Sequence, residues 1–188
     1  MVNTPKPIVA IFGGSFDPPH LGHQKIVSLI LESLSIDKLL IVPTYLNPFK
    51  TETFADASQR LAWCHTIFDT LPKVSVEAYE VAQGKSITTE QTVKHFNTLY
   101  SVKYLVIGSD NLESLTKWHH FEWLNSTITW VIIHRKGYDM KTSALHNWLS
   151  LTLDVPISST QIRQEKNLDT VDIKIKHSVK SLLEGFKP

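Results

Sequence analysis

Short apolar segments alternate with amphipathic segments along most of this 188-residue chain. The apolar segments are rich in β-branched residues and are bounded by glycine or proline, as buried strands are. The segments between them repeat apolar residues three and four positions apart, which is typical of helices. This alternation predicts an α/β fold: a Rossmann-like, doubly wound, mostly parallel sheet with helices on both faces, in a single domain over residues 1–188.

The order of the predicted elements brings certain loops together. We expect strands at residues 8–12, 39–42, 74–81, 104–107, 128–133 and 149–153. We expect helices at residues 21–34, 56–71 with Asp56 as N-cap, 89–99 begun by Thr88 or Thr89, 159–165 and 171–183. The loops that follow parallel strands form the ligand crevice of such a sheet. Glycine, aromatic and polar residues concentrate in four of these loops, at 13–20, 43–50, 108–120 and 134–139.

Charge and cysteine content exclude several classes of protein. The 19 basic and 18 acidic residues give a net charge of +1, without the basic surface that nucleic-acid binding requires. The single cysteine, Cys64, rules out a disulfide within the chain and a cysteine-based metal site, and its apolar position predicts a core thiol. Prolines interrupt the N-terminal apolar run, and no apolar run is long enough to span a bilayer. We therefore expect a cytoplasmic protein with no nucleic-acid or membrane partner.

The segment FGGSFDPPHLGHQKI, at residues 12–26, ends the first predicted strand and begins the first predicted helix. Gly13 and Gly14 directly follow the strand, where they permit a tight turn and let backbone N–H groups approach a ligand. The prolines after Asp17 make a rigid bend that sets up the helix start. Because a helix N-terminus attracts negative charge, this corner favours phosphate.

Two histidines lie at the start of that helix. His20 and His23 are three residues apart and so share one helix face, and Gly22 between them leaves room for a bulky group against the backbone. Imidazoles beside a helix N-terminus suit phosphate binding. Zinc binding is a second interpretation, although no third ligand is evident nearby, and a plain turn with surface histidines is a third. We predict no dedicated metal site.

A second polar segment, ISSTQIR at residues 157–163, lies near the C-terminal end. Ser158, Ser159 and Thr160 provide hydroxyl groups and backbone N–H groups at a helix start. Arg163 follows one turn later and is one of only three arginines in the chain. Hydroxyl, amide and guanidinium groups that converge in this way suit a polyphosphate. Taken alone, the same residues also fit an ordinary serine cap with a surface arginine.

The string G-G-S-F-D-P-x-H-x-G-H at residues 13–23 resembles the first signature motif of the HxGH nucleotidyltransferase superfamily, and residues 157–163 resemble the second. Members of this superfamily transfer AMP or CMP from a nucleoside triphosphate. The second motif lacks the leading arginine of the cytidylyltransferases, which favours adenylyl transfer. His20 argues against the pantetheine-phosphate branch, which usually has threonine at that position.

Nearly the whole chain is similar to the bacterial nicotinate mononucleotide adenylyltransferases. Besides the two motifs, the matching segments are IVPTYLNPFK, the helix with Arg60, T-x-Q-T-V, IGSD, Trp118 and RKGY. The resemblance implies adenylyl transfer from ATP to nicotinate mononucleotide, a step of NAD biosynthesis, with Mg²⁺ bound mainly through the ATP phosphates. Alternatives are nicotinamide mononucleotide or phosphopantetheine as acceptor, and a non-catalytic nucleotide sensor on the same fold. A homo-oligomer is left open.

The resemblance also implies roles for individual residues. It makes His20 and His23 the catalytic residues. It assigns ATP binding to Gly13, Gly14, Ser15, Phe16, Gly108, Asp110, Ser159, Thr160 and Arg163. It assigns substrate binding to Lys50, Thr89, Trp118, His119 and Arg135, with Trp118 as a shelf for the nicotinate ring and the amides of Thr89 and His119 for its carboxylate.

Some of these positions also allow other interpretations. Thr88 stands where the family often has tyrosine, and His119 stands where it often has a second aromatic residue. Trp118 also fits a core residue, as most tryptophans are. Arg60 lies at a polar helix position, where a solvated role and a functional role fit about equally.

Overall fold

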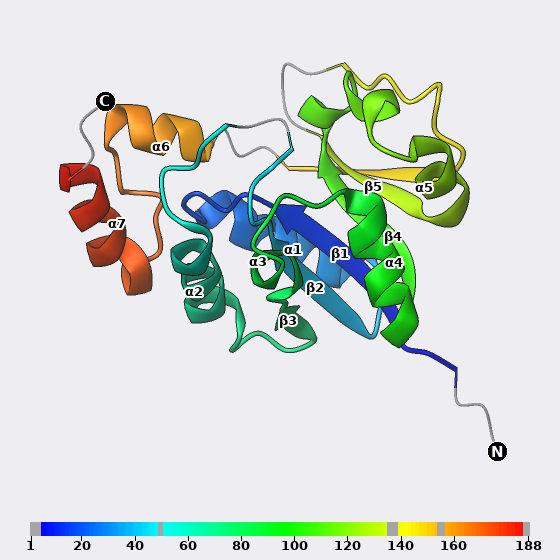
Figure 1. The fold of residues 1–188 in the computed structure, drawn as a ribbon, viewed down its shortest axis with the longest axis horizontal. Coiled ribbons are helices and arrows are strands. Elements are labelled where there is room, and N and C mark those ends of the chain that lie inside the picture. The colour runs from blue at the N-terminus through cyan, green and yellow to red at the C-terminus, as the bar shows by residue number, and fades with distance from the viewer. Residues whose placement is uncertain (1–4, 49–50, 135–138, 154–156, 186–188) are drawn as a thin grey trace.

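The computed structural model describes residues 5–48, 51–134, 139–153 and 157–185. Within these residues, six parallel strands form one sheet in the order β3-β2-β1-β4-β5-β6 (Figure 1). The strands are β1 (Ile8–Gly14), β2 (Lys38–Pro43), β3 (Val74–Val76), β4 (Ser101–Gly108), β5 (Thr129–His134) and β6 (Trp148–Thr152). The predicted doubly wound α/β fold is therefore confirmed.

Helices cover both faces of the sheet (Figure 1). They are α1 (Leu21–Ser33), α2 (Ala57–Phe68), α3 (Tyr79–Ala82), α4 (Thr89–Leu99), α5 (Phe121–Thr127), α6 (Ser159–Glu165) and α7 (Ile173–Gly185), with short 3₁₀ turns η1 (Ser109–Asn111) and η2 (Leu115–Lys117). Successive residues of β1 face opposite ways. Ala10 and Phe12 belong to the core with α1, α2 and α7, whereas Val9 and Ile11 belong to the core with α4 and α5. Both faces of β1 are buried, which explains its continuous apolar run.

Side-chain caps begin two helices where the sequence predicts them. The Asp56 carboxylate accepts a hydrogen bond of 2.7 Å from the backbone N–H of Gln59 at the start of α2. Thr88 is the N-cap of α4 and forms a capping box with Gln91. Helix α5, which follows the 108–120 loop, was not predicted, because its seven residues are too short to show a clear period.

The predicted strand at 74–81 is wrong in its second half. Only Val74–Val76 is a strand, and residues 79–82 form α3. β3 is an edge strand that pairs with β2 alone, and this pairing ends at Val76 although β2 continues to Pro43. Tyr79 instead stacks on His95 of α4, with ring centroids 3.7 Å apart.

The chain changes direction across the sheet between β1 and β4. These strands are neighbours, and the chain continues from β1 to β2 on one side and from β4 to β5 on the other. The loops after β1 and β4 therefore diverge and leave a crevice at the carboxyl ends of the strands. Among the described helices, none is long and apolar enough to cross a membrane.

Candidate active site

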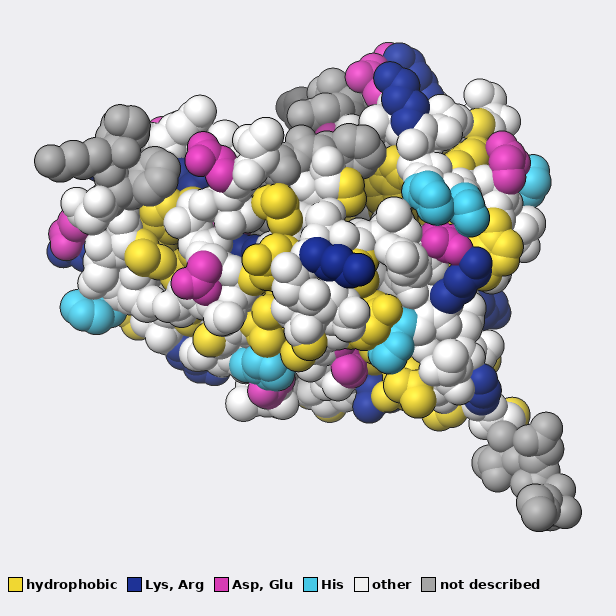
Figure 2. Space-filling model, in the orientation of Figure 1, with side chains coloured by type: hydrophobic (Ala, Val, Ile, Leu, Met, Phe, Trp, Pro, Cys, Tyr) yellow, Lys and Arg dark blue, Asp and Glu magenta, His cyan; other side chains and the backbone are white. Residues whose placement is uncertain are grey.

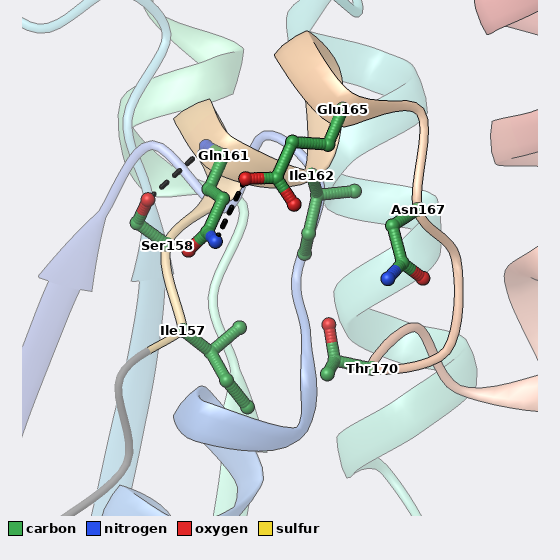
Figure 3. Close-up of a pocket in the computed structure, with 7 residues that line it drawn as sticks. All are labelled: Ile157, Ser158, Gln161, Ile162, Glu165, Asn167 and Thr170. Carbon is green, nitrogen blue, oxygen red and sulfur yellow. Dashed lines mark hydrogen bonds between the residues drawn. The ribbon is translucent and has the colours of Figure 1, made fainter.

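A cavity of about 550 Å³ opens at the carboxyl ends of β1 and β4 and is lined by both signature motifs. A volume of this size is sufficient for a nucleotide. A smaller hollow of about 80 Å³ lies beside α6, where the Gln161 amide donates to the Glu165 carboxylate over 2.9 Å (Figure 3). Only the larger cavity has room for a substrate of the predicted kind.

All the predicted site residues that the structure describes line this cavity. They are His20, His23, Gly13, Gly14, Ser15, Phe16, Gly108, Asp110, Ser159, Thr160, Arg163, Thr89, Trp118 and His119. The remaining two, Lys50 and Arg135, lie outside the described residues. Residues from four loops that are far apart in the sequence thus share one space.

Two imidazoles form the start of α1. His20 is the N-cap, and its Nδ1 accepts a hydrogen bond of 3.1 Å from the backbone N–H of Gly22. The Nδ1 of His23 accepts a hydrogen bond of 3.2 Å from the backbone N–H of His20. Because both Nδ1 atoms act as acceptors, this hydrogen bonding assigns the proton of each neutral ring to Nε2. The corner therefore carries two Nε2–H groups on rings that are tilted by 34° to one another, with centroids 3.9 Å apart.

The glycines of the first motif act differently from the sequence prediction. Gly13 and Gly14 are the last residues of β1, not a turn after it, and the left-handed residue of this corner is Phe16, with φ of 47°. A Cβ on Gly14 would lie 3.3 Å from the Phe16 ring. A Cβ on Gly22 would lie 2.9 Å from two atoms of the His20 ring. The bulky group for which Gly22 makes room is thus the imidazole of His20.

The second motif is bonded directly to the first. The Ser159 hydroxyl donates to the carbonyl of Pro18 over 2.9 Å, and Arg163 Nη1 donates to the carbonyl of Asp17. Arg163 Nη2 also donates to the Thr160 hydroxyl over 3.3 Å. The interpretation of Arg163 as a plain surface arginine is therefore wrong. The Arg163 guanidinium thus holds the start of α6 against the Asp17–Pro18 bend that precedes α1.

Arg60 is fully buried, so its interpretation as a solvated residue is also wrong. Its guanidinium donates to the carbonyls of Ala55, Ser15, Thr44 and Tyr45 over 2.6–3.1 Å. Burial lowers the pKa of Arg60, and the nearby Asp17 carboxylate opposes that shift. Arg60 thereby joins the loop after β1, the loop after β2 and the start of α2.

Trp118 belongs both to the core and to the cavity wall. Its ring meets the ring of Trp130 edge to face, with centroids 6.3 Å apart. Its indole Nε1–H is buried and has no hydrogen-bond partner among the described residues. A buried donor without a partner costs free energy, so a ligand acceptor in the cavity would relieve that cost.

Sequence reasoning missed Glu80, a buried carboxyl in the cavity wall. The Thr92 hydroxyl donates to it over 2.6 Å. Burial raises the pKa of Glu80 to about 7, although the hydrogen bond from Thr92 acts in the opposite direction. Glu80 lies in the segment that the sequence predicts as a strand, at residues 74–81. The apolar alternation of that segment gives no indication that the Glu80 side chain faces a ligand cavity.

A second buried acidic residue, Glu90, directly follows Thr89 of the cavity wall at the start of α4. Lys94 donates to its carboxylate and holds the pKa of Glu90 below its ordinary value, with smaller contributions from His120 and His119. Within the described part of the chain, Glu90, His119 and His120 form the one group of three or more histidine, cysteine or acidic residues close enough to share a metal ion. Cys64, by contrast, is fully buried, and burial raises the pKa of its thiol, as a core position implies.

Comparison with known proteins agrees with this geometry. Residues 11–165 match the family model described as cytidylyltransferase-like. The parallel sheet, the two bonded motifs and this match define a nucleotidyltransferase of the α/β class.

The chain is 57% identical over 187 residues to the "Probable nicotinate-nucleotide adenylyltransferase" of Sulfurovum sp. (strain NBC37-1), covering 100% of both chains. It is 42% identical over 181 residues to the protein of the same name from Campylobacter jejuni (strain RM1221), covering 95% of this chain and 98% of that one. The protein belongs to the nicotinate-nucleotide adenylyltransferase family.

Solved structures share the fold. The nicotinic acid mononucleotide adenylyltransferase of Plasmodium falciparum, complexed with NaAD, matches with a TM-score of 0.74 and 18% identity over 95% of each chain. A putative nicotinate-nucleotide adenylyltransferase from Vibrio parahaemolyticus matches with a TM-score of 0.60 and 24% identity over 94% of this chain and 98% of that one.

Proposed function

We propose that the protein transfers the adenylyl group of ATP to nicotinate mononucleotide, giving nicotinate adenine dinucleotide and pyrophosphate. The observation that carries this proposal is the docking of the second motif on the first, where Ser159 and Arg163 bond to the Asp17–Pro18 backbone beside both histidines. The names of the relatives supply the acceptor. The same cavity extends to Trp118 and Thr89, so one space can hold both substrates.

The reaction requires positioning and charge stabilisation more than acid–base chemistry. The 5′-phosphate of nicotinate mononucleotide is already an anion, and its oxygen attacks the α-phosphorus of ATP in line. A bond forms between that oxygen and the α-phosphorus, and the bond to the bridging oxygen of the β-phosphate breaks, releasing pyrophosphate. No proton must be removed from the nucleophile, so we assign no general base.

The phosphate groups would lie between the two motifs. We assign His23 Nε2–H to the α-phosphate, where charge spreads over the equatorial oxygens, and His20 to the same or the adjacent phosphate. The backbone of Gly14 and Ser15 supplies further donors. Ser159, Thr160 and Arg163 hold the β- and γ-phosphates, which leave together, and Lys50 adds charge from the opposite loop. Gly108 and Asp110 contact the adenosine.

The acceptor would lie at the start of α4. Trp118 carries the pyridine ring, and its unpaired Nε1–H is available to an acceptor atom. The backbone amides of Thr89 and His119 face the nicotinate carboxylate, which the N-terminus of α4 favours. Arg135 completes the assigned acceptor contacts.

We further propose that Mg²⁺ arrives on the phosphates of ATP and is held mainly by phosphate oxygens and water. Two carboxyls of the cavity are already engaged: Asp17 accepts from the backbone N–H groups of Phe54 and Ala55, and Glu80 accepts from Thr92. These hydrogen bonds favour Mg²⁺ that arrives with ATP over Mg²⁺ held at a preformed protein site. Mg²⁺ bound in this way would neutralise phosphate charge. We also propose that residues 1–188 form one domain and that the enzyme works in the cytoplasm.

Pyrophosphate release from ATP tests the function. The protein is assayed with nicotinate mononucleotide, nicotinamide mononucleotide and phosphopantetheine as separate acceptors, each against a blank without acceptor. We expect the highest kcat/KM with nicotinate mononucleotide. Turnover with phosphopantetheine alone would show that the acceptor is wrong, and ATP binding without any turnover would favour the sensor alternative.

A further inference from the structure

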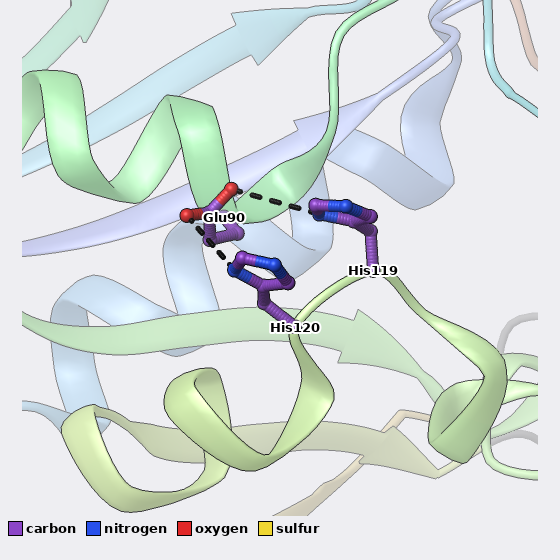
Figure 4. A group of neighbouring side chains, drawn as sticks. All are labelled: Glu90, His119 and His120. Atoms are coloured by element: carbon purple, nitrogen blue, oxygen red, sulfur yellow. Dashed lines mark ion pairs between the residues drawn. The ribbon is translucent and has the colours of Figure 1, made fainter.

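Three potential metal ligands converge from two separate segments behind the acceptor end of the cavity. Glu90 is the second residue of α4, and His119 and His120 immediately precede α5 (Figure 4). His120 Nδ1 lies 3.3 Å from Glu90 Oε1, and His119 Nδ1 lies 3.8 Å from Glu90 Oε2. In the space-filling view, histidine side chains gather beside acidic and basic ones over the region of α4 and α5 (Figure 2).

These separations fit a small transition-metal ion. A tetrahedral zinc ion with bonds of about 2.0–2.1 Å keeps its ligand atoms about 3.3 Å apart. The ligand atoms of Glu90, His119 and His120 all lie within 4.8 Å of one another. Because an ion lies in the plane of each imidazole that ligates it, one of the two stacked rings must turn out of the stack when the ion binds. Two histidines and one carboxylate are also the ligand set of zinc sites that keep a fourth position open.

The local backbone brings the two imidazoles to the same side of the chain. Adjacent residues of an extended chain point their side chains in opposite directions. Here His120 has φ of 54° and ψ of 39°, in the left-handed region, and the rings of His119 and His120 stack with centroids 4.0 Å apart and planes 13° apart. Both Nδ1 atoms consequently face the same carboxylate. A left-handed histidine is uncommon and carries a conformational cost, which a bound ligand would offset.

Burial holds the side chain of Glu90, the carboxylate ligand, in a fixed position. The Glu90 side chain is 5% exposed, whereas those of His119 and His120 are 58% and 55% exposed. The carboxylate ligand is thus held by the protein interior, and the two imidazole ligands remain open to an ion entering from solvent. An open entry path and a fixed carboxylate are both requirements for a usable site.

Lys94 is the competing cation at this carboxylate. Its ammonium bonds to Glu90 Oε1 and is itself half exposed. The same ammonium lies 5.0 Å from the ring centroid of Trp123, so a second favourable position is within reach if a metal ion displaces it. An ion that binds Glu90 must therefore displace the Lys94 ammonium, and this competition would lower the affinity for the ion.

We propose that Glu90, His119 and His120 bind one divalent transition-metal ion of the zinc class, with Lys94 as an intrinsic competitor. The ion would connect the start of α4 to the segment before α5. Since His119 also lines the cavity, the site lies at the rim of the acceptor pocket. This inference concerns metal binding alone and does not depend on the proposed function.

The test measures metal binding by the full-length protein after treatment with a chelator. Zn²⁺ titration by calorimetry gives stoichiometry and affinity, and Co²⁺ as a spectroscopic probe reports ligand geometry through its visible absorption. We expect one ion per chain. We expect His119→Ala and His120→Ala each to weaken binding about tenfold or more. Lys94→Met should tighten binding severalfold because it removes the competitor.

A matched control separates this site from other histidines. His177→Ala alters an exposed histidine of α7 and should leave the affinity unchanged. Circular dichroism of each variant checks that the fold is retained. The proposal is overturned if the chain takes up no ion, if binding survives both His119→Ala and His120→Ala, or if His20→Ala removes it instead. Unchanged affinity in Lys94→Met overturns the competition by that lysine.

Discussion

Arg163 donates a hydrogen bond to the backbone carbonyl of Asp17, 146 residues earlier in the chain. This contact joins the two signature motifs before any substrate binds. The guanidinium still offers further N–H groups, since a planar fork carries five donors. The same side chain can therefore hold the protein bend and a phosphate at once.

Replacing Arg163 with lysine keeps the positive charge but removes the planar guanidinium with its several N–H donors. A single ammonium cannot bond to Asp17, Thr160 and a phosphate in the same geometry. We expect Arg163→Lys to lower kcat/KM for ATP by about 10–100-fold, with little change in thermal stability. Steady-state kinetics at varied ATP measures the effect, and an unchanged kcat/KM for ATP would contradict the phosphate-binding role of Arg163.

Two substitutions at His23 separate its capping role from its catalytic role. Asparagine can still accept from the His20 backbone N–H but lacks a donor at the position of Nε2, whereas glutamine can place a donor there. We expect His23→Asn to lower kcat about 100-fold or more with stability retained, and His23→Gln to recover part of that loss. Single-turnover kinetics and thermal melting provide the comparison. Equal turnover in the wild type and His23→Asn would disprove the assignment.

Gly22→Ala should disturb catalysis through a neighbouring side chain. The added Cβ would lie 2.9 Å from the buried His20 ring, which has little space to move. We expect a loss of about 1–3 kcal/mol in the free energy of unfolding, together with a clear fall in kcat. Gly185→Ala is the matched control, because nothing lies within 4 Å of its added Cβ. Similar behaviour of both variants would mean that the His20 contact is unimportant.

Arg60→Met removes four buried hydrogen bonds but keeps an unbranched side chain. The carbonyls of Ser15, Thr44, Tyr45 and Ala55 would lose their donor. We expect a loss of about 3–5 kcal/mol in the free energy of unfolding, measured by urea denaturation. Arg60→Lys should rescue little of it, because one ammonium cannot reach all four oxygens. A near-wild-type midpoint for Arg60→Met would contradict the structural role of this guanidinium.

Glu80 makes stability depend on pH. Its pKa is raised from 4.5 to about 7 in the folded protein, so the folded state retains a proton that the unfolded state releases. The stabilising contribution is complete below about pH 4.5 and is lost as pH rises through about 7, for a total on the order of 3 kcal/mol. Glu80→Gln should therefore lose less stability than the wild type between pH 5 and pH 8 in urea unfolding. Glu32→Gln, at an exposed position, is the control, and identical slopes for all three proteins would refute the raised pKa.

Local sequence patterns were enough to predict most of the elements and both motifs. Alternating apolar periods predict β1, β2, β4 and β5 and the helices α1, α2 and α4, although not α5, and Asp56 and Thr88 begin α2 and α4 as expected, because period and capping are local properties. The strand prediction for residues 74–81 fails after Val76 because β3 pairs with β2 at three positions only and the chain then turns into α3, which the local alternation does not record.

Which polar side chains are enclosed, and what they contact, depends on the packing of the whole chain. Arg60 and Glu80 occupy ordinary polar positions in the sequence, yet packing of distant segments buries both. The Arg163–Asp17 bond and the convergence of His119 and His120 on Glu90 likewise depend on how far-apart loops meet at one edge of the sheet. Burial and such contacts arise from the packing of the whole chain, and they set the hydrogen bonds and pKa values on which the proposed chemistry depends.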